Sequence, residues 1–185
     1  RLSLVGSEMC IRDRNKALCI FVLSQDFKNE LIRRGIKSDI HLTSTKVPDY
    51  FISGFDLSMR QGKAENIMYS GRIEKAKGVY ETVDTFSILK SQYKDLTLTF
   101  VGDGSELPML KQYVENKKIK DVRFTGELRG EDFKKEYINA DMYLFLSYTE
   151  GMPTVVLEAM IFGLPIFTRK VGGLIDFFEN GKMGY

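Results

Sequence analysis

The sequence contains little that would support a disulfide scaffold, a zinc site or a membrane span. Its 185 residues include two cysteines, Cys10 and Cys19, and one histidine, His41. No CxxC pair or His/Cys cluster occurs, which argues against disulfide frameworks and structural zinc and fits a reducing compartment. The longest apolar run, 17–24, has the length of a strand and falls well short of the roughly 20 residues of a membrane span.

Net charge is also small. The chain has 27 Lys and Arg against 25 Asp and Glu, a formal charge of +2. That is too little to argue for nucleic acid on bulk electrostatics, and the lysines are interleaved with acids as on a solvated surface. Hydrophobic residues make up 43% and charged residues 28%, which is typical of a globular chain with a real core. The length suits one sizeable domain, or one domain with part of another.

The first fourteen residues, RLSLVGSEMCIRDR, need separate treatment. They lack the sustained apolar core of a signal peptide and end in charges. They resemble translated sequencing-adapter read-through, so we treat residues 1–14 as non-native, Cys10 included. The last residues, ENGKMGY, stop where a further strand would start. We therefore expect a fragment at both ends.

From residue 15 on, short apolar runs alternate with helical segments. The expected strands are 17–24, 39–45, 66–71, 96–102, 122–126, 141–147 and 165–169. The expected helices are 25–35, 77–93, 105–118, 130–140, 153–163 and 173–181. Ser24 and Ser105 suit N-caps, and Gly35 suits a helix stop. Strands separated by helices of about 10 to 15 residues predict repeated βαβ units, that is, an α/β fold with a Rossmann-like parallel sheet flanked by helices.

Two of these helices have a recognisable inward face. In the first, Phe27, Leu31 and Ile32 share one helical face. In the second, the residues expected to point inward are Val79, Val83, Phe86 and Leu89. Segment 46–65 has no clear period and is expected to be a linker. Ligands of parallel sheets bind outside the carboxyl ends of the strands. The loops of interest are therefore 71–72, 102–105, 126–128, 147–153 and 169–173.

The loop SGRIEKAKG carries two cations, Arg72 and Lys77, close to a helix start. The helix dipole disfavours cations there, which suggests an anion brought from outside. A diphosphate would satisfy the arginine fork, the ammonium and the free N–H groups together. The plainer alternative is two surface cations with Glu74 as a local partner. From this loop alone that alternative is favoured.

The loop SYTEGMPTVVLEAM carries two glutamates, Glu150 and Glu158. Pro153 suits the first helical position, which places Glu150 before the helix and Glu158 inside it among apolar neighbours. A partly buried carboxylate needs partners, and sugar hydroxyls supply two donors in fixed geometry. The alternatives are a dipole-favoured acid for Glu150 and a surface helix residue for Glu158. Taken singly, these alternatives are preferred.

Two further loops contain paired glycines. The turn after the strand 96–102 has Gly102 and Gly104 around an aspartate, and Gly172 and Gly173 precede the last expected helix. Glycine permits close backbone approach to a ligand. The pattern matches neither GxGxxG nor Walker A. Each loop alone is equally well explained as a tight or flexible turn.

The segments GRIEKAKG, VGDG, VRFTGEL, EGMPTVVLEAMIFGLPIF and VGGLIDFFENGKMG occur in this order. As a series they resemble the C-terminal, donor-binding domain of GT-B glycosyltransferases of family 4, the glycosyl transferases group 1. The resemblance covers about 66–185, and the Glu-x7-Glu motif with its Gly and Pro is its most specific part. It implies that 15–63 is a remnant of the N-terminal domain plus linker, and that 64–185 is a C-terminally truncated nucleotide-sugar-binding domain.

The resemblance implies a retaining glycosyltransferase of hexosyl type that uses a nucleotide diphosphate sugar. Arg72 and Lys77 match the pair that neutralises the diphosphate, Glu150 the glutamate near the donor sugar hydroxyls, and Glu158 the glutamate that binds the ribose hydroxyls. Arg72, Lys77 and Glu150 are the expected catalytic set. The expected donor-binding residues are Gly71, Leu128, Gly151, Met152, Pro153, Thr154, Val155, Glu158, Gly172 and Gly173.

The family needs no divalent metal or other cofactor, which agrees with the absence of a DxD motif. The implied partners are the donor and a saccharide or lipid-linked acceptor in polysaccharide biosynthesis, without nucleic acid. Peripheral membrane contact through the missing N-terminal domain stays open, and the implied location is the cytoplasm, with the inner face of the membrane as the default. The fragment is expected to be inactive, because the active site lies between two domains.

Some residues depart from the family pattern. Met152 and Pro153 stand where a pair such as Phe-Gly is common, and Asp176 stands where Glu is common. His41 matches no family role and is expected to be structural or exposed. Alternatives on the same fold are a nucleotide-sugar epimerase, a phosphorylase, or a non-catalytic nucleotide-binding module. A phosphorylase would need a pyridoxal-phosphate lysine, and no such motif is evident in this sequence.

Overall fold

A computed structural model describes residues 14–43, 45–48, 51–60 and 64–185. All of the segment 1–14 that we expected to be non-native, except Arg14, lies outside the described residues. The chain divides into two compact units. Unit 1 comprises Arg1–Lys46, Glu150–Pro153 and Lys170–Phe177, and unit 2 comprises Val47–Thr149, Thr154–Arg169 and Phe178–Tyr185.

Unit 1 is built on a two-stranded parallel sheet. Strand β1 (Cys19–Val22) pairs with β2 (Asp39–Leu42), and helix α2 (Gln25–Arg33) connects them. Its core is the buried cluster Val22, Leu31, Ile36 and Ile40, with Ile20 and Phe27 packed against it. The expected strands and helix are present, with shorter bounds than the sequence suggested.

The ends of α2 follow the sequence signals. The Oγ of Ser24 accepts a hydrogen bond of 3.2 Å from the backbone N–H of Phe27, which confirms Ser24 as the N-cap. Gly35 follows the helix with φ +78°, a conformation that glycine adopts without penalty. Of the three residues that share the apolar face of α2, Leu31 is buried, whereas Ile32 is 55% exposed. Two strands cover only a narrow stripe of the helix, which Phe27 and Leu31 fill.

Unit 2 contains a five-stranded parallel sheet in the order β5-β4-β3-β6-β7. The strands are β3 (Asn66–Ser70), β4 (Thr97–Val101), β5 (Val122–Phe124), β6 (Met142–Phe145) and β7 (Ile166–Thr168). The predicted α/β class with a parallel sheet is confirmed. Strand order reverses at β3, so the chain leaves β3 toward one edge and later returns on its other side. Such a switch point is where parallel sheets bind ligands.

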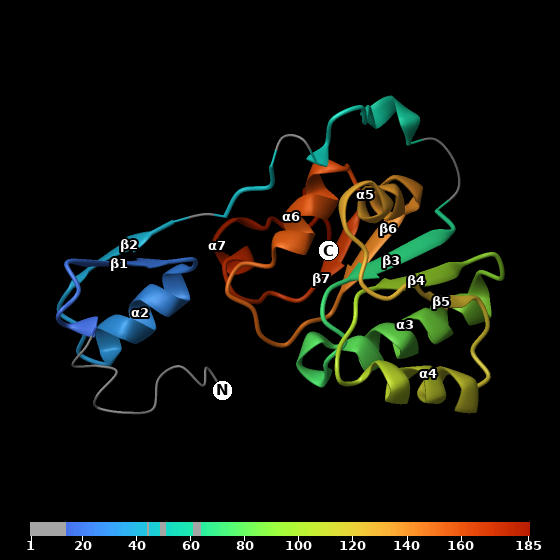
Figure 1. Ribbon diagram of the computed structural model, residues 1–185, viewed down its shortest axis with the longest axis horizontal. Coiled ribbons are helices and arrows are strands. Elements are labelled where there is room, and N and C mark those ends of the chain that lie inside the picture. The colour runs from blue at the N-terminus through green and yellow to red at the C-terminus, as the bar shows by residue number, and fades with distance from the viewer. Residues whose placement is uncertain (1–13, 44, 49–50, 61–63) are drawn as a thin grey trace. The chain divides into compact units, whose positions relative to one another are not determined.

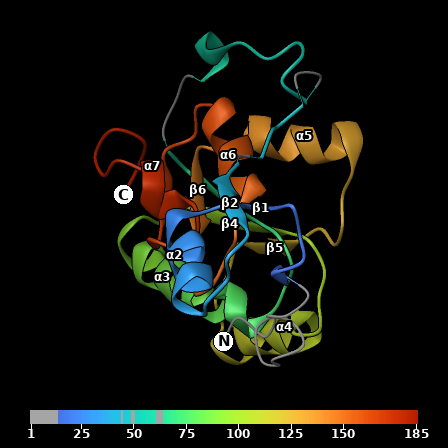
Figure 2. The same cartoon turned by 90° about the vertical axis from the view of Figure 1, so that its left-hand side faces the viewer.

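Helices cover both faces of this sheet. The helices are α3 (Val79–Gln92), α4 (Leu107–Asn116), α5 (Gly130–Asn139) and α6 (Thr154–Ile161). Both views show α3 and α4 on one face and α5 and α6 on the other (Figures 1 and 2). Val79, Val83 and Phe86 of α3 are fully buried as expected. Leu89, also expected to point inward, is only partly buried.

Helices α3 and α4 both start later than expected. The segment Lys75–Lys77 forms a separate 3-10 turn, η3, and Gly78 with φ +66° divides it from α3. A side chain at Gly78 would lie 2.0 Å from the carbonyl oxygen of Leu146, so only glycine fits this junction. The Ser105 cap was wrong, because Glu106 is the N-cap of α4 and makes no side-chain capping bond. A tight turn, in which Leu107 N–H donates to Gly104 O at 3.1 Å, starts this helix instead.

The last expected helix, 173–181, was too long. Helix α7 (Leu174–Phe177) ends after four residues. The following residues satisfy their backbone elsewhere: Gly181 N–H donates to Gly184 O at 2.7 Å, and Tyr185 N–H donates to Ile166 O at 2.7 Å. The pairing of Gly184 with Ile166 is parallel. The chain therefore runs alongside β7 at its end, where the sequence suggested the start of a strand.

Within the expected linker 46–65, the described residues 47–48, 51–60 and 64–65 belong to unit 2, while 49–50 and 61–63 lie outside the described residues. It contains a short 3-10 turn, η2 (Leu57–Met59). The rings of Phe51 and Phe55 lie 5.3 and 5.0 Å from that of Phe162. Arg60 donates to the carbonyl oxygens of three residues at the ends of α5 and α6, namely Tyr137 (2.7 Å), Ala140 and Phe162. Burial lowers the pKa of Arg60, and the nearby Asp141 raises it in part.

Candidate functional site

The turns after β3, β4 and β5 are tied together by their backbones. Gly71 N–H donates to Val101 O at 3.0 Å, and Gly102 N–H donates to Gly126 O at 2.8 Å. Gly102 has φ +140°, and a Cβ there would lie 1.9 Å from Gly71 O. Neither the conformation nor the space admits a side chain, so the glycine at 102 is a requirement of strand-end packing.

A cavity of about 340 Å³ opens beside these turns. It is lined by Gly71, Arg72, Val101, Gly102, Asp103, Glu127, Leu128, Phe133 and Val155. Four of the lining residues were expected to bind the donor: Gly71, Arg72, Leu128 and Val155. They come from separate parts of the sequence, and the carboxyl ends of β3 and β4 contribute Gly71 and Gly102 directly. The cavity therefore lies where ligands of parallel sheets bind.

The two expected diphosphate cations differ in their surroundings. The side chain of Arg72 is 70% exposed, and its Nη1 lies 2.9 Å from Glu74 Oε1. The Glu74 pair that the sequence offered as the plainer explanation is thus present. Lys77 extends from η3 toward the loop after β6, with its Nζ 3.5 Å from Thr149 O. Arg72 lines the cavity, and Lys77 is not among its lining residues.

Glu158 is held by a tyrosine. The Tyr137 hydroxyl donates to Glu158 Oε2 at 2.8 Å. The sequence suggested that apolar neighbours would leave this glutamate partly buried, and burial raises the pKa of its carboxyl while the bond from Tyr137 lowers it. Glu158 follows the cavity residue Val155 by three positions, about one helical turn. The carboxylate therefore lies on the same side of α6 as Val155.

Behind Tyr137 lies a buried hydrogen-bond network that the sequence did not reveal. Tyr137 OH lies 2.8 Å from Ser70 Oγ, which lies 2.9 Å from Tyr143 OH. Burial raises the pKa of both tyrosines, so their hydroxyls stay protonated at neutral pH. A tyrosine on an amphipathic helix reads as ordinary core. No local signal in the sequence would have pointed to this role.

In unit 1, the glycine pair lies against the segment that begins with Glu150. Gly173 N–H donates to Gly151 O at 2.6 Å. Gly172 has φ +53°, and a Cβ there would lie 2.3 Å from Gly151 O and 2.5 Å from Glu150 O. The paired glycines thus serve a close approach between two backbone segments. This approach fixes the peptide groups that follow Glu150.

Two departures from the family pattern have structural partners in unit 1. A Cβ at Gly173 would lie 2.2 Å from Met152 Cε, so the methionine side chain covers the glycine. Asp176 Oδ2 accepts a 2.7 Å hydrogen bond from the backbone N–H of Gln25. Gln25 begins α2, where an acidic group is favoured by the helix dipole. Pro153, which the sequence placed at the start of the helix, immediately precedes α6.

The predicted site residues are divided between the two units. Unit 1 holds Glu150, Gly151, Met152, Pro153, Gly172 and Gly173, and unit 2 holds Gly71, Arg72, Lys77, Leu128, Thr154, Val155 and Glu158. Their assignment as catalytic or donor-binding residues stays a prediction. His41 of β2 is exposed, and its ring lies 5.6 Å from that of Phe21.

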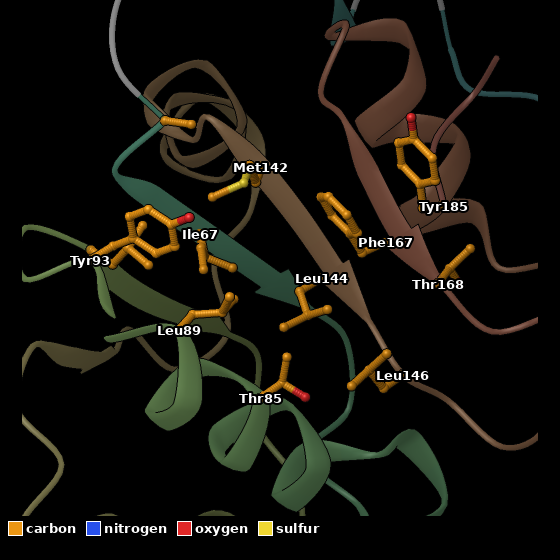
Figure 3. A pocket seen from close by; sticks show the side chains of 12 residues that line it. Ile67, Thr85, Leu89, Tyr93, Met142, Leu144, Leu146, Phe167, Thr168 and Tyr185 are labelled. Carbon is orange, nitrogen blue, oxygen red and sulfur yellow. The ribbon is translucent and has the colours of Figure 1, made fainter. Parts of the chain in front are cut away.

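A larger cavity of about 610 Å³ lies elsewhere in unit 2. Figure 3 shows Thr85 and Leu89 of α3 across from Leu144 and Leu146, at the sheet face rather than at the strand-end turns. Its lining is predominantly apolar: Ala64, Ile67, Thr85, Leu89, Tyr93, Leu96, Met142, Leu144, Leu146, Phe167, Thr168 and Tyr185. It contains none of the predicted site residues and few groups that could bind a charged ligand.

The family model described as glycosyl transferases group 1 matches residues 58–185. The chain belongs to this family. The glycosyltransferase chain is 31% identical over 126 residues to glycogen synthase of Mycobacterium tuberculosis, covering 68% of this chain and 30% of that protein. It is 32% identical over 120 residues to N-acetyl-alpha-D-glucosaminyl L-malate synthase of Bacillus anthracis, covering 64% and 31%. The chain thus spans about a third of the length of these curated relatives.

Solved structures place the glycosyltransferase chain in the GT-B fold. S. aureus TarM, solved with UDP, has a TM-score of 0.82 at 19% identity over 96% of this chain and 35% of that one. The C-terminal domain of LpcC, a glycosyl transferase group 1 protein of Francisella tularensis, has a TM-score of 0.60 at 25% identity, covering 65% and 66%. The predicted family and fold are confirmed.

The described residues offer neither a metal cluster nor a membrane-spanning helix. No group of three or more His, Cys, Asp or Glu side chains that could hold a metal ion occurs within residues 14–43, 45–48, 51–60 and 64–185. Across the same residues, none of the helices is long and apolar enough to cross a bilayer. The expectation that no metal or cofactor is needed stays a prediction.

Proposed function

We propose that this chain binds the donor in a retaining glycosyltransferase that moves a sugar from a nucleotide diphosphate sugar to a saccharide or lipid-linked acceptor. The cavity at the carboxyl ends of β3 and β4 carries the proposal, because four residues expected to bind the donor line it together. Its size is in the range of small-molecule sites. The proposed location is the cytoplasm, at the inner face of the membrane, in polysaccharide synthesis.

Charge neutralisation is the main chemical contribution that we assign to unit 2. Transfer from a nucleotide diphosphate sugar leaves negative charge on the departing diphosphate, and fixed positive groups lower the barrier to its departure. Arg72 supplies a guanidinium at the cavity, and its pairing with Glu74 at 2.9 Å orients it without burying it. Lys77 is the second cation in this proposal. Together they would replace a divalent metal.

Glutamates provide the hydroxyl contacts. We assign Glu158 to the ribose hydroxyls and Glu150 to the hydroxyls of the donor sugar. An ionised carboxylate accepts several hydrogen bonds, as vicinal hydroxyls require. Between the two, residues 151–155 lead into α6, and its first N–H groups suit a phosphate. Leu128, which lines the cavity, is assigned to the nucleotide base.

Relatives support the substrate class. The curated relatives are named as sugar transferases or synthases, among them glycogen synthase and a sulfoquinovosyl transferase of Arabidopsis thaliana. Several neighbours were solved with UDP or UDP-glucose, including Anabaena HepE with UDP-glucose, at a TM-score of 0.75.

Donor binding can be tested on the chain itself by titration calorimetry with UDP, GDP and ADP. We expect one of them to bind, and Arg72→Ala to weaken it roughly 10- to 100-fold, because a hydrogen bond to a charged group contributes about 1.5–3 kcal/mol. The matched control is Arg33→Ala, an exposed arginine of unit 1 paired with Glu30, which should leave the affinity unchanged. Absence of binding by all three nucleotides would refute the proposal.

Stereochemistry is tested separately. Where transfer can be measured, the anomeric proton of the product in NMR reports the configuration. The same configuration as in the donor supports a retaining enzyme, and the opposite configuration contradicts it. Donor binding with interconversion of the sugar instead of transfer would favour the epimerase alternative. Binding with neither reaction would favour a non-catalytic module.

A further inference from the structure

We propose that Tyr137 is a positioning residue that holds one oxygen of Glu158 and leaves the other to accept from the ribose hydroxyls of the donor. The inference rests on the proposed function, in which Glu158 contacts the ribose. It assigns a role in donor recognition to a residue of α5 that does not line the cavity. Ser70 and Tyr143 belong to the same hydrogen-bond network.

Proton counting fixes the direction of the network. An ionised Glu158 can only accept, so the single hydroxyl proton of Tyr137 goes to Oε2, 2.8 Å away. The Tyr137 oxygen must then accept, and the hydroxyl 2.8 Å from it is that of Ser70. Ser70 has now used its one proton, so Ser70 Oγ can only accept from Tyr143, whose single proton faces both Ser70 Oγ at 2.9 Å and Ser70 O at 3.2 Å. The direction from Ser70 to Tyr137 to Glu158 is therefore fixed by the ionised carboxylate at its end.

Packing keeps the Tyr137 ring in place. The ring is fully buried. It stacks on Phe162 with centroids 5.3 Å apart at 11°, and on Tyr143 at 6.1 Å and 22°. Phe51 meets it edge-on at 5.7 Å and 84°. A hydroxyl carried by so confined a ring donates in a constant direction, so the carboxylate that accepts from it is also oriented.

Glu158 retains acceptor capacity. In the part of the chain that the structure describes, the bond from Tyr137 is the one hydrogen bond that this carboxylate makes, and Oε1 takes no part in it. The residue is partly exposed. A carboxylate with one oxygen held and the other accessible suits a ligand that offers hydroxyl donors.

The network also reaches the strand that opens the cavity. Ser70 is the last residue of β3 and immediately precedes Gly71 and Arg72. Tyr143 OH lies 3.2 Å from Ser70 O as well as near its Oγ. The group assigned to the ribose and the turn assigned to the diphosphate are therefore linked through four elements, α6, α5, β6 and β3. This linkage sets their spacing.

Protonation gives the proposal a second readout. Burial raises the pKa of Glu158, and the Tyr137 bond opposes this. The titratable groups that face the carboxylate are Tyr137 from α5 and Tyr143 from β6, whose own pKa values are raised partly by it. No charged side chain contributes to the pKa of Glu158 among the described residues. Removing the Tyr137 hydroxyl should raise the pKa of Glu158 further. As the pH is lowered, the variant should therefore protonate Glu158, and lose ribose binding, at a higher pH than wild type.

The test compares wild type, Tyr137→Phe and Tyr113→Phe with two ligands over pH 5 to 8. The ligands are whichever of UDP, GDP or ADP binds wild type, and its 2′,3′-dideoxy analogue. Tyr113 is the matched control, because its hydroxyl bonds to Asp84 on the α3–α4 side. We expect wild type and Tyr113→Phe to prefer the ribose form by roughly 10-fold or more, the effect of hydrogen bonds to a charged group.

For Tyr137→Phe we expect that preference to fall severalfold, with unchanged affinity for the dideoxy analogue and an onset of binding at higher pH. Equal weakening of both ligands, or an unchanged preference and pH profile, would overturn the proposal. If Tyr137→Phe does not fold, Ser70→Ala should show the same change to a smaller degree, and an unaltered preference there counts against the network. Failure of wild type to bind any nucleotide would instead refute the proposed function.

Discussion

Replacing Gly102 by alanine should damage the fold at the point where the cavity begins. The new Cβ would stand 1.9 Å from Gly71 O, whereas ordinary contact begins at 3.4 Å. The backbone at Gly71 would have to withdraw by about 1.5 Å, the difference between these distances. Such a shift cannot keep the bonds of Gly71 to Val101 (3.0 Å) and of Gly102 to Gly126 (2.8 Å).

The expected cost combines two effects. A strained backbone conformation for a non-glycine residue costs about 1–3 kcal/mol. Leaving a backbone donor or acceptor without its partner costs about 1–3 kcal/mol. The free energy of unfolding should therefore fall by about 4 kcal/mol, a large part of the roughly 5–15 kcal/mol that holds a domain together.

Gly126→Ala is the matched control. Gly126 has φ +76°, but a Cβ there would meet nothing within 4 Å, so it should cost about 1 kcal/mol from strain alone. Urea unfolding followed by circular dichroism measures the free energy of unfolding of both variants, and the two values are compared if the dependence on urea concentration is the same. If the two substitutions destabilise the chain equally, the clash with Gly71 does not govern the turn and the reasoning is wrong.

Two further substitutions test separate features. Glu158→Gln should raise the thermal midpoint at pH 8 and weaken nucleotide binding. Because the folded-state pKa of Glu158 is raised, the protonated carboxyl contributes fully to the stability of the folded chain below pH 4.5, the ordinary value. That contribution is lost as the pH rises through the raised value, whereas glutamine stays neutral. The gain should vanish below pH 4.5, and a constant gain at every pH would contradict it. Ser24→Ala should destabilise unit 1 by about 1 kcal/mol through loss of its cap on Phe27, and amide hydrogen exchange in α2 should speed up while that in α3 stays unchanged.

Local signals in the sequence predicted most of the architecture. Buried strands of a parallel sheet need apolar residues on both faces, so their runs stand out without tertiary information. The inward positions Val79, Val83 and Phe86 and the Ser24 cap have the same local origin, and all four were confirmed. Family motifs then selected cavity residues that no single loop justified, such as Leu128.

What the sequence could not supply are contacts that depend on the assembled fold. Ser105 resembles a cap by residue type, yet the turn at Gly104 starts α4. The helix from 173 has no stop signal at Phe177. The residues beyond it form a turn, in which Met183 N–H donates to Glu179 O at 3.0 Å, and Tyr185 then bonds to β7. Ile32 belongs to the apolar face of α2 but stays exposed, because a two-stranded sheet is too narrow to cover it. Tyr137 looks like core until Ser70 and Glu158 are placed beside it.

Arg60 shows how far the glycosyltransferase fold of unit 2 depends on residues ahead of its first strand. Its guanidinium donates hydrogen bonds to carbonyl oxygens at the ends of α5 and α6, the two helices that carry Tyr137 and Glu158. A recombinant domain started at residue 64 would open both helix ends at once. Its sheet would be complete, but fraying would begin one turn from Glu158. Such a shortened domain would therefore lose nucleotide affinity under conditions in which it was still folded.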